Sequence, residues 1–70
     1  MNKITIETPF IRLDSALKLS GLAQTGGHAK ILIQDGLVQV NGECCRMRGK
    51  KLVPGDRFEL EHQQFEVVSK

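Results

Sequence analysis

Apolar residues recur at helical spacing in two stretches of the chain. In the first, Leu13, Ala16 and Leu17 fall on one face of a helix, because residues three and four apart are neighbours on a helix surface. We expect this helix to begin near Arg12 and to end at Gly21, since glycine is common just past the C-terminal end of a helix.

The second helical stretch begins after Thr25. Threonine is a favourable N-cap residue because its hydroxyl can accept a hydrogen bond from a free backbone N–H of the first turn. Gly36 marks the expected end of this helix. The buried stripe between these two residues is predicted to contain Ala29, Leu32 and Ile33.

Gly26 and Gly27 lie in the first turn of this second helix. They need an explanation, because glycine costs about 0.5–1 kcal/mol relative to alanine in a helix. Close packing of the two helices would require small residues here. Alternatively, bare backbone N–H groups could approach a phosphate, helped by the positive end of the helix dipole. The sequence leaves both explanations open.

The remaining segments alternate apolar and polar residues, as strands with one buried face do. Asn41-Gly42 is a strong signal for a type I′ hairpin turn, and Val53 to Asp56 forms a second predicted turn around Pro54-Gly55. Strands are expected at Lys3–Glu7, Leu37–Val40, Glu43–Arg46, Arg57–Glu61 and Gln64–Val68, with an exposed turn at His62. This order predicts one α+β domain over residues 1–70, with two short helices packed on a small, mostly antiparallel sheet.

The chain is too short for a deep substrate cavity. A protein of this size buries only about 60% of the surface that its unfolded chain exposes, so nearly every apolar side chain is needed for packing. No Ser/His/Asp or paired-carboxylate arrangement is evident, and Cys44, Cys45 and the two histidines lack zinc-site spacing. We therefore expect no enzyme activity, no catalytic residue, no metal and no cofactor.

Cys44 and Cys45 also bear on the cellular compartment. Neighbouring side chains on a strand point to opposite faces, so these two thiols are badly placed to bond to each other. Without a disulfide framework, the expected location is the reducing cytoplasm. Which thiol is buried is left open. Residues 1–10 contain charges and Pro9 rather than an apolar run of signal-peptide length, and no membrane span is predicted.

Positive charge is concentrated in one segment. The net charge is only +2 at pH 7, but residues 46–51, Arg-Met-Arg-Gly-Lys-Lys, carry four positive charges and no negative one. Acidic residues follow later, at Asp56, Glu59, Glu61 and Glu66. One basic face and one neutral or acidic face is typical of nucleic-acid-binding domains. A solvated hairpin loop is the alternative explanation.

If this basic segment forms a hairpin arm, its geometry suits a phosphate backbone. Arg46, Arg48 and Lys50 would project to one face of a strand about 6–7 Å apart, which approximates the spacing of phosphates along one strand. Lys51 adds a further charge. Arginine suits bidentate phosphate contacts, and lysine acts as a point charge.

The three aromatic residues favour a particular kind of nucleic acid. Phe10, Phe58 and Phe65 lie in apolar patterns and are expected in or near the core. A binder of single strands normally exposes aromatic rings on which bases stack. Double-stranded or tertiary-structured RNA, recognised by shape and phosphates, is therefore the favoured partner.

The order of several short motifs resembles a known family. Arg12-Leu13-Asp14 is followed by Ala29-x-x-Leu32-Ile33-x-x-Gly36-x-Val38-x-Val40-Asn41-Gly42 and then by Pro54-Gly55-Asp56. This pattern resembles the RNA-binding domain named after small-subunit ribosomal protein S-four, over roughly residues 11–60. With no catalytic domain attached, the chain is most similar to the small stand-alone bacterial members of the YaaA/YbcJ type.

The resemblance implies an S-four-like fold, the alpha-L RNA-binding motif, whose two helices form an exposed face that docks on ribosomal or transfer RNA. Carried over by position, Arg12 and Lys30 would face the RNA, with Gln34 a weaker candidate. The family often has Ser-Arg where this chain has Thr25-Gly26. The cap is kept and the arginine is lost, so we expect the arm at residues 46–51 to compensate.

His28, beside Lys30, is a further candidate for a phosphate or base contact; the alternative is a partly exposed polar residue. The main hypothesis is a cytoplasmic, monomeric RNA-binding protein that docks on structured RNA, with ribosomal RNA in ribosome assembly or maintenance implied by the resemblance. The second hypothesis is a protein-interaction adaptor that uses a sheet edge or the apolar residues near Leu37. A third, a subunit of a modifying enzyme, is disfavoured by ends that look complete at Met1 and Lys70.

Overall fold

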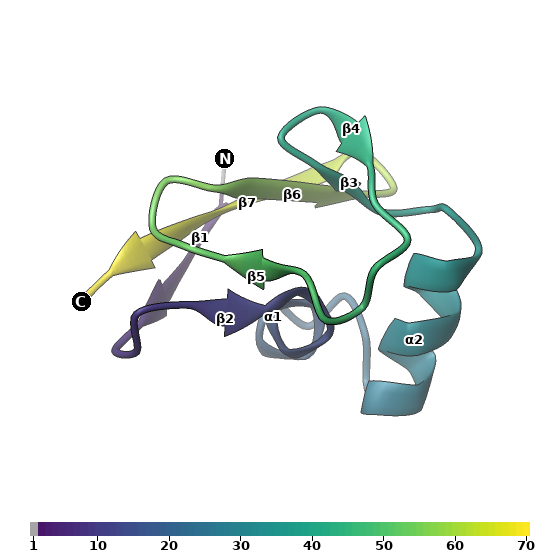
Figure 1. Cartoon of the computed structure of the whole chain (residues 1–70), viewed down its shortest axis with the longest axis horizontal. Coiled ribbons are helices and arrows are strands. Elements are labelled where there is room, and N and C mark those ends of the chain that lie inside the picture. Colours follow the sequence, from purple (N-terminus) through teal and green to yellow (C-terminus); the bar gives the residue numbers. More distant parts are fainter. Residues whose placement is uncertain (1) are drawn as a thin grey trace.

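The computed structural model describes residues 2–70, and Met1, the expected start of the chain, lies outside the described residues. The described residues form two helices and several short strands, arranged as in Figure 1. In chain order the elements are β1 (Asn2–Ile6), β2 (Ile11–Arg12), α1 (Leu13–Leu19), α2 (Gly26–Gln34), β3 (Gln39–Val40), β4 (Glu43–Cys44), β5 (Lys51–Leu52), β6 (Arg57–Leu60) and β7 (Gln63–Ser69).

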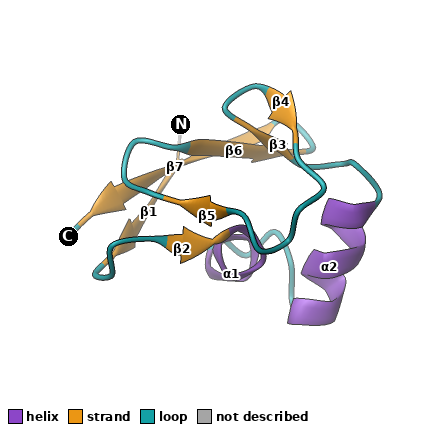
Figure 2. Ribbon diagram, in the orientation of Figure 1, coloured by secondary structure: helices purple, strands orange, loops and turns teal. Residues whose placement is uncertain are grey.

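The strands form two sheets. The larger sheet has the order β1-β7-β6-β3-β4, in which β1 runs parallel to β7 and the other neighbours are antiparallel. The smaller sheet is the antiparallel pair β2-β5. Figure 2 shows the helices to one side of the larger sheet, with the β2-β5 pair close to the start of α1. The predicted α+β class and mostly antiparallel sheet are confirmed.

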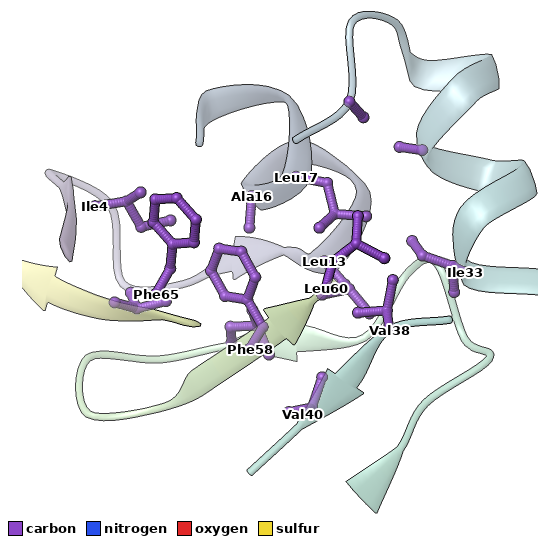
Figure 3. Close-up of a cluster of buried hydrophobic side chains, with 14 of the residues drawn as sticks. Ile4, Leu13, Ala16, Leu17, Ile33, Val38, Val40, Phe58, Leu60 and Phe65 are labelled. Carbon is purple, nitrogen blue, oxygen red and sulfur yellow. The ribbon is translucent and has the colours of Figure 1, made fainter. Parts of the chain in front are cut away.

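The core lies between the helices and the inner face of the larger sheet (Figure 3). From α1, the predicted face of Leu13, Ala16 and Leu17 is fully buried. It packs against alternate residues of β6 and β7, among which the rings of Phe58 and Phe65 stack with centroids 5.5 Å apart. Buried apolar side chains thus alternate with more exposed ones along both strands, and the more exposed ones are polar except Val68.

Local signals set the ends of α2 and the main hairpin. The Thr25 hydroxyl accepts a hydrogen bond from the backbone N–H of His28 at 3.0 Å, as expected of an N-cap. Asn41 and Gly42 have φ values of 52° and 86°, so the predicted type I′ turn between β3 and β4 is confirmed. Asp56 closes the second predicted turn by accepting a hydrogen bond from the N–H of Val53 at 2.9 Å.

The structure also decides between the explanations for the two helical glycines. A Cβ atom added at Gly26 would meet nothing within 4 Å, and one added at Gly27 would meet only the Thr25 hydroxyl oxygen, at 3.9 Å. Close packing between the helices is therefore the wrong explanation. The approach of a phosphate to these N–H groups stays a prediction.

Candidate nucleic-acid interface

The basic segment from Arg46 to Lys51 is a loop between the two sheets, and the expectation of a hairpin arm is wrong. The return strand predicted over residues 43–46 ends at Cys44, and only Lys51 of the basic segment lies in a strand, β5. Strand β5 pairs with β2 in the smaller sheet rather than with β4. The expected alignment of Arg46, Arg48 and Lys50 along one strand face is consequently absent.

This loop takes its path because it caps helix α1. The first backbone N–H groups of a helix have no partner inside the helix, and the side chain of the N-cap residue Arg12 accepts no hydrogen bond from them. The loop satisfies them instead: Leu13 N–H donates to the carbonyl of Lys50 at 2.8 Å and Asp14 N–H to the carbonyl of Arg48 at 3.1 Å. Its backbone is thereby fixed while its charged side chains stay exposed.

The other end of the loop lies against the end of α2. Gly36, just past this helix, has a φ of 77°. The guanidinium group of Arg46 covers it so closely that a Cβ atom there would lie 2.8–3.2 Å from three of its atoms. Figure 1 shows the loop running beside α2 before it crosses the start of α1. The cysteines precede this loop, with Cys44 exposed and Cys45 half-buried.

Arg12 lies beside the same loop. Its guanidinium contacts Asp14 at 3.4 Å and lies next to Gly49, where an added Cβ atom would be 3.6 Å from Nη2. Asp14 lies in the first turn of α1, where a negative charge is favourable, and its carboxylate also accepts a hydrogen bond from the N–H of Ser15 at 2.8 Å. The side chain of Arg12 is nevertheless half exposed.

Few acidic side chains form ion pairs with the positively charged side chains of the loop and its surroundings. The ion pairs found among residues 2–70 involve Arg12, Arg57 and Lys70. On the outer face of the larger sheet, by contrast, Arg57 pairs with Glu66 at 3.9 Å, and the further carboxylate Glu59 accepts a 2.7 Å hydrogen bond from Gln64. The positively charged side chains without an ion pair in this region of the described chain are Lys30, Arg46, Arg48, Lys50 and Lys51.

The remaining predicted contact residues lie on two different flanks of helix α2. Lys30 and Gln34 are exposed and lie one turn apart, on one side of the buried stripe of Ala29 and Ile33. The other five predicted contact residues are Arg12, which lies beside the loop, and Arg46, Arg48, Lys50 and Lys51 of the loop segment itself. We define the basic surface by Arg12, Lys30, Gln34, Arg46, Arg48, Lys50 and Lys51.

His28 lies on the opposite flank of α2 and outside the basic surface. It borders a hollow with Leu22, Leu32 and Glu61, and its Nδ1 accepts a hydrogen bond from the backbone N–H of Gln24 at 3.3 Å. A contact from His28 would require RNA to reach across the N-terminal end of α2.

The expectation that Phe10 lies in or near the core is wrong. Phe58 and Phe65 are buried as expected, but Phe10 is 39% exposed. It precedes β2, and the Nζ atom of Lys51 lies 4.8 Å from its ring centroid. The alternation of apolar and polar residues does not reveal this exposure, because the neighbouring strand β2 pairs with β5 in the smaller sheet and not with the larger one.

Within residues 2–70 there is no group of three or more His, Cys, Asp or Glu side chains placed to hold a metal ion. The longest helix in this range, α2, has nine residues, and no described helix has the length and apolar character needed to cross a bilayer.

Fold and site together define a class of small α+β domain, in which two helices and a backbone-anchored basic loop lie beside a mostly antiparallel sheet. The family model of the S4 domain matches residues 4–68, and the chain belongs to this family. The resemblance stated from the sequence motifs is therefore confirmed.

Individual relatives agree with this assignment. The chain is 42% identical over 69 residues to the Bacillus subtilis protein named "Probable ribosome maturation protein RlbA", with 97% of both chains covered. It is 33% identical over 61 residues to YbcJ of Escherichia coli, with 87% of both covered. The solution structure of YbcJ, described as revealing an αL motif involved in RNA-binding, matches with a TM-score of 0.74 at 30% identity, over 97% of this chain and 87% of that one.

The 30S ribosomal protein S4e of Thermoplasma acidophilum shares the fold. Its crystal structure matches with a TM-score of 0.65 at 20% identity, over 86% of this chain and 32% of that one. The domain is thus a small part of a larger chain there.

Proposed function

We propose that this protein binds structured RNA through the basic surface, without catalysing a reaction. The observation that carries this proposal is the loop at residues 46–51. Its four cations have no ion-pair partner among the described residues, and its carbonyls are fixed to the start of α1. Cations held on a fixed backbone can contact phosphates without first losing the freedom of a mobile loop.

Shape recognition is the expected mode of binding. A-form RNA hides its base edges in a deep, narrow groove, so small domains contact mainly phosphates and 2′-hydroxyl groups. The basic surface offers arginine and lysine for phosphates and the Gln34 amide for a hydroxyl group. The missing arginine next to Thr25 would be replaced by Arg46 and Arg48, which approach from the loop. Base-sequence specificity is then weak.

The proposed physiological partner is ribosomal RNA or a ribosomal particle, engaged by a monomer in the cytoplasm during ribosome assembly or maintenance. The relatives support this, since one is named as a ribosome maturation protein and another has a motif described as involved in RNA-binding. The charge pattern supports an RNA partner as such, and the ribosomal assignment rests on the relatives.

A protein-interaction adaptor is the second proposal, because Leu37 at the start of the main hairpin is 52% exposed. Fluorescence anisotropy with a structured ribosomal RNA fragment across a salt series separates the two. About four phosphate contacts predict affinity that falls roughly a hundredfold from about 50 to about 200 mM salt. Absence of binding, or binding unaffected by salt, would contradict the RNA proposal and favour a protein partner.

A further inference from the structure

Phe10 occupies the outer face of the smaller sheet, next to the basic surface. Ile11 and Leu52 are Cα partners, as are Arg12 and Lys51. Leu52 is buried and Ile11 packs against the core. Because side chains alternate along a strand, Arg12 and Lys51 project outward, and Phe10, two residues from Arg12, shares that outer face. An exposed ring therefore lies among cations.

The backbone that carries the ring is fixed before any partner arrives. The Thr8 hydroxyl donates a 2.7 Å hydrogen bond to the carbonyl of Phe10, and Pro9 restricts the backbone between them. The Lys51 Nζ atom lies 4.8 Å from the ring centroid, a distance suited to a cation–π contact. Because the Lys51 ammonium lies over one face of the ring, a flat group that stacks on that face takes its place and leaves the ammonium free to contact a phosphate. The fixed backbone lowers the conformational freedom that this stacking costs.

We propose that Phe10 is a stacking site for one unpaired nucleobase of the bound RNA. This inference rests on the proposed function, because phosphate contacts to Arg12 and Lys51 would bring the backbone of that nucleotide beside the ring. Bases within a continuous helix are stacked on each other and unavailable, so the occupant is a bulged or loop nucleotide. Stacking tolerates every base, since each has a π-face.

The test compares two hairpin RNAs that differ by one nucleotide. One has a continuous stem, and the other carries a single bulged 2-aminopurine, whose fluorescence reports stacking. We expect the protein to bind the bulged hairpin about tenfold more tightly, with quenching of the probe. Phe10→Leu, which keeps an apolar side chain without the aromatic face, should lose the preference and the quenching while it binds the continuous stem normally.

Two controls keep the outcomes distinct. Leu37→Ala, at another exposed apolar residue, should keep the preference, and circular dichroism checks that each variant folds. Equal affinity of the unmodified protein for the two hairpins, or an unchanged preference in Phe10→Leu, would overturn the stacking site alone. Failure to bind either hairpin would overturn the RNA-binding proposal as well.

Discussion

A variant in which Arg46, Arg48, Lys50 and Lys51 are all replaced by glutamine is expected to bind structured RNA about 10- to 100-fold more weakly at moderate salt. Each lost phosphate contact lowers the slope of log affinity against log salt by about 0.7–0.9, so the slope should fall by about 3. The fold should survive, because backbone carbonyls of the loop, not its charged side chains, cap α1. Fluorescence anisotropy across a salt series measures both quantities.

The matched control removes the same charge elsewhere. Replacing Lys3, Lys18, Arg57 and Lys70 with glutamine also takes four positive charges from a net charge of +2, so long-range attraction falls by the same amount. We expect this variant to keep most of the salt slope. Equal losses in the two variants would mean that net charge, rather than the basic loop, governs binding.

Phe58→Ala is expected to remove a large share of the free energy of unfolding. Phe58 is 1% exposed and stacks on Phe65, and removal of a buried phenylalanine typically costs about 3–5 kcal/mol. A domain of this length has a free energy of unfolding of only about 4–10 kcal/mol. Because the chain contains no Trp or Tyr, urea unfolding is best followed by far-ultraviolet circular dichroism.

Phe10→Ala makes the same chemical change at an exposed position and is the natural comparison. It leaves no cavity in the core and should cost less than about 1 kcal/mol. A similar loss of stability in the two variants would contradict the division into a buried Phe58–Phe65 pair and an exposed Phe10.

The sequence was a good guide wherever a structure is decided by neighbouring residues. The apolar face of α1, the Thr25 cap and the Asn41-Gly42 turn each depend on residues within one or two turns of chain, and the structure confirms all three. The same holds for the inward alternation of Phe58 and Leu60. The spacing of apolar residues and the residue types at the turns are enough to predict these features.

The sequence was a poor guide where a segment binds a distant partner. The loop at residues 46–51 is held by hydrogen bonds from free N–H groups at the start of α1, more than thirty residues earlier in the chain. The alternation of charges within the loop does not reveal this distant partner. Phe10 is exposed for a related reason, since β2 pairs with β5 instead of joining the larger sheet. The parallel pairing of β1 with β7 joins the two ends of the chain and has no local signal either.

The sequence names the residues of the candidate site but does not reveal how they are arranged. Charge density alone identified Arg46, Arg48, Lys50 and Lys51, and the family resemblance added Arg12, Lys30 and Gln34. Their actual grouping around the start of α1 and the end of α2 depends on the path of the loop. His28 was grouped with Lys30 because they are close in sequence, yet the helix turns them to different flanks.

The most direct test of the basic surface is a titration of the isotope-labelled protein with a structured ribosomal RNA fragment, followed by backbone amide NMR. We predict the largest shift changes at the start of α1, in residues 46–51 and along the exposed flank of α2 that carries Lys30. The outer face of the larger sheet, with Gln39, Arg57 and Glu59, should change little. Changes confined to that sheet face would contradict the account and place the RNA on the opposite side of the molecule.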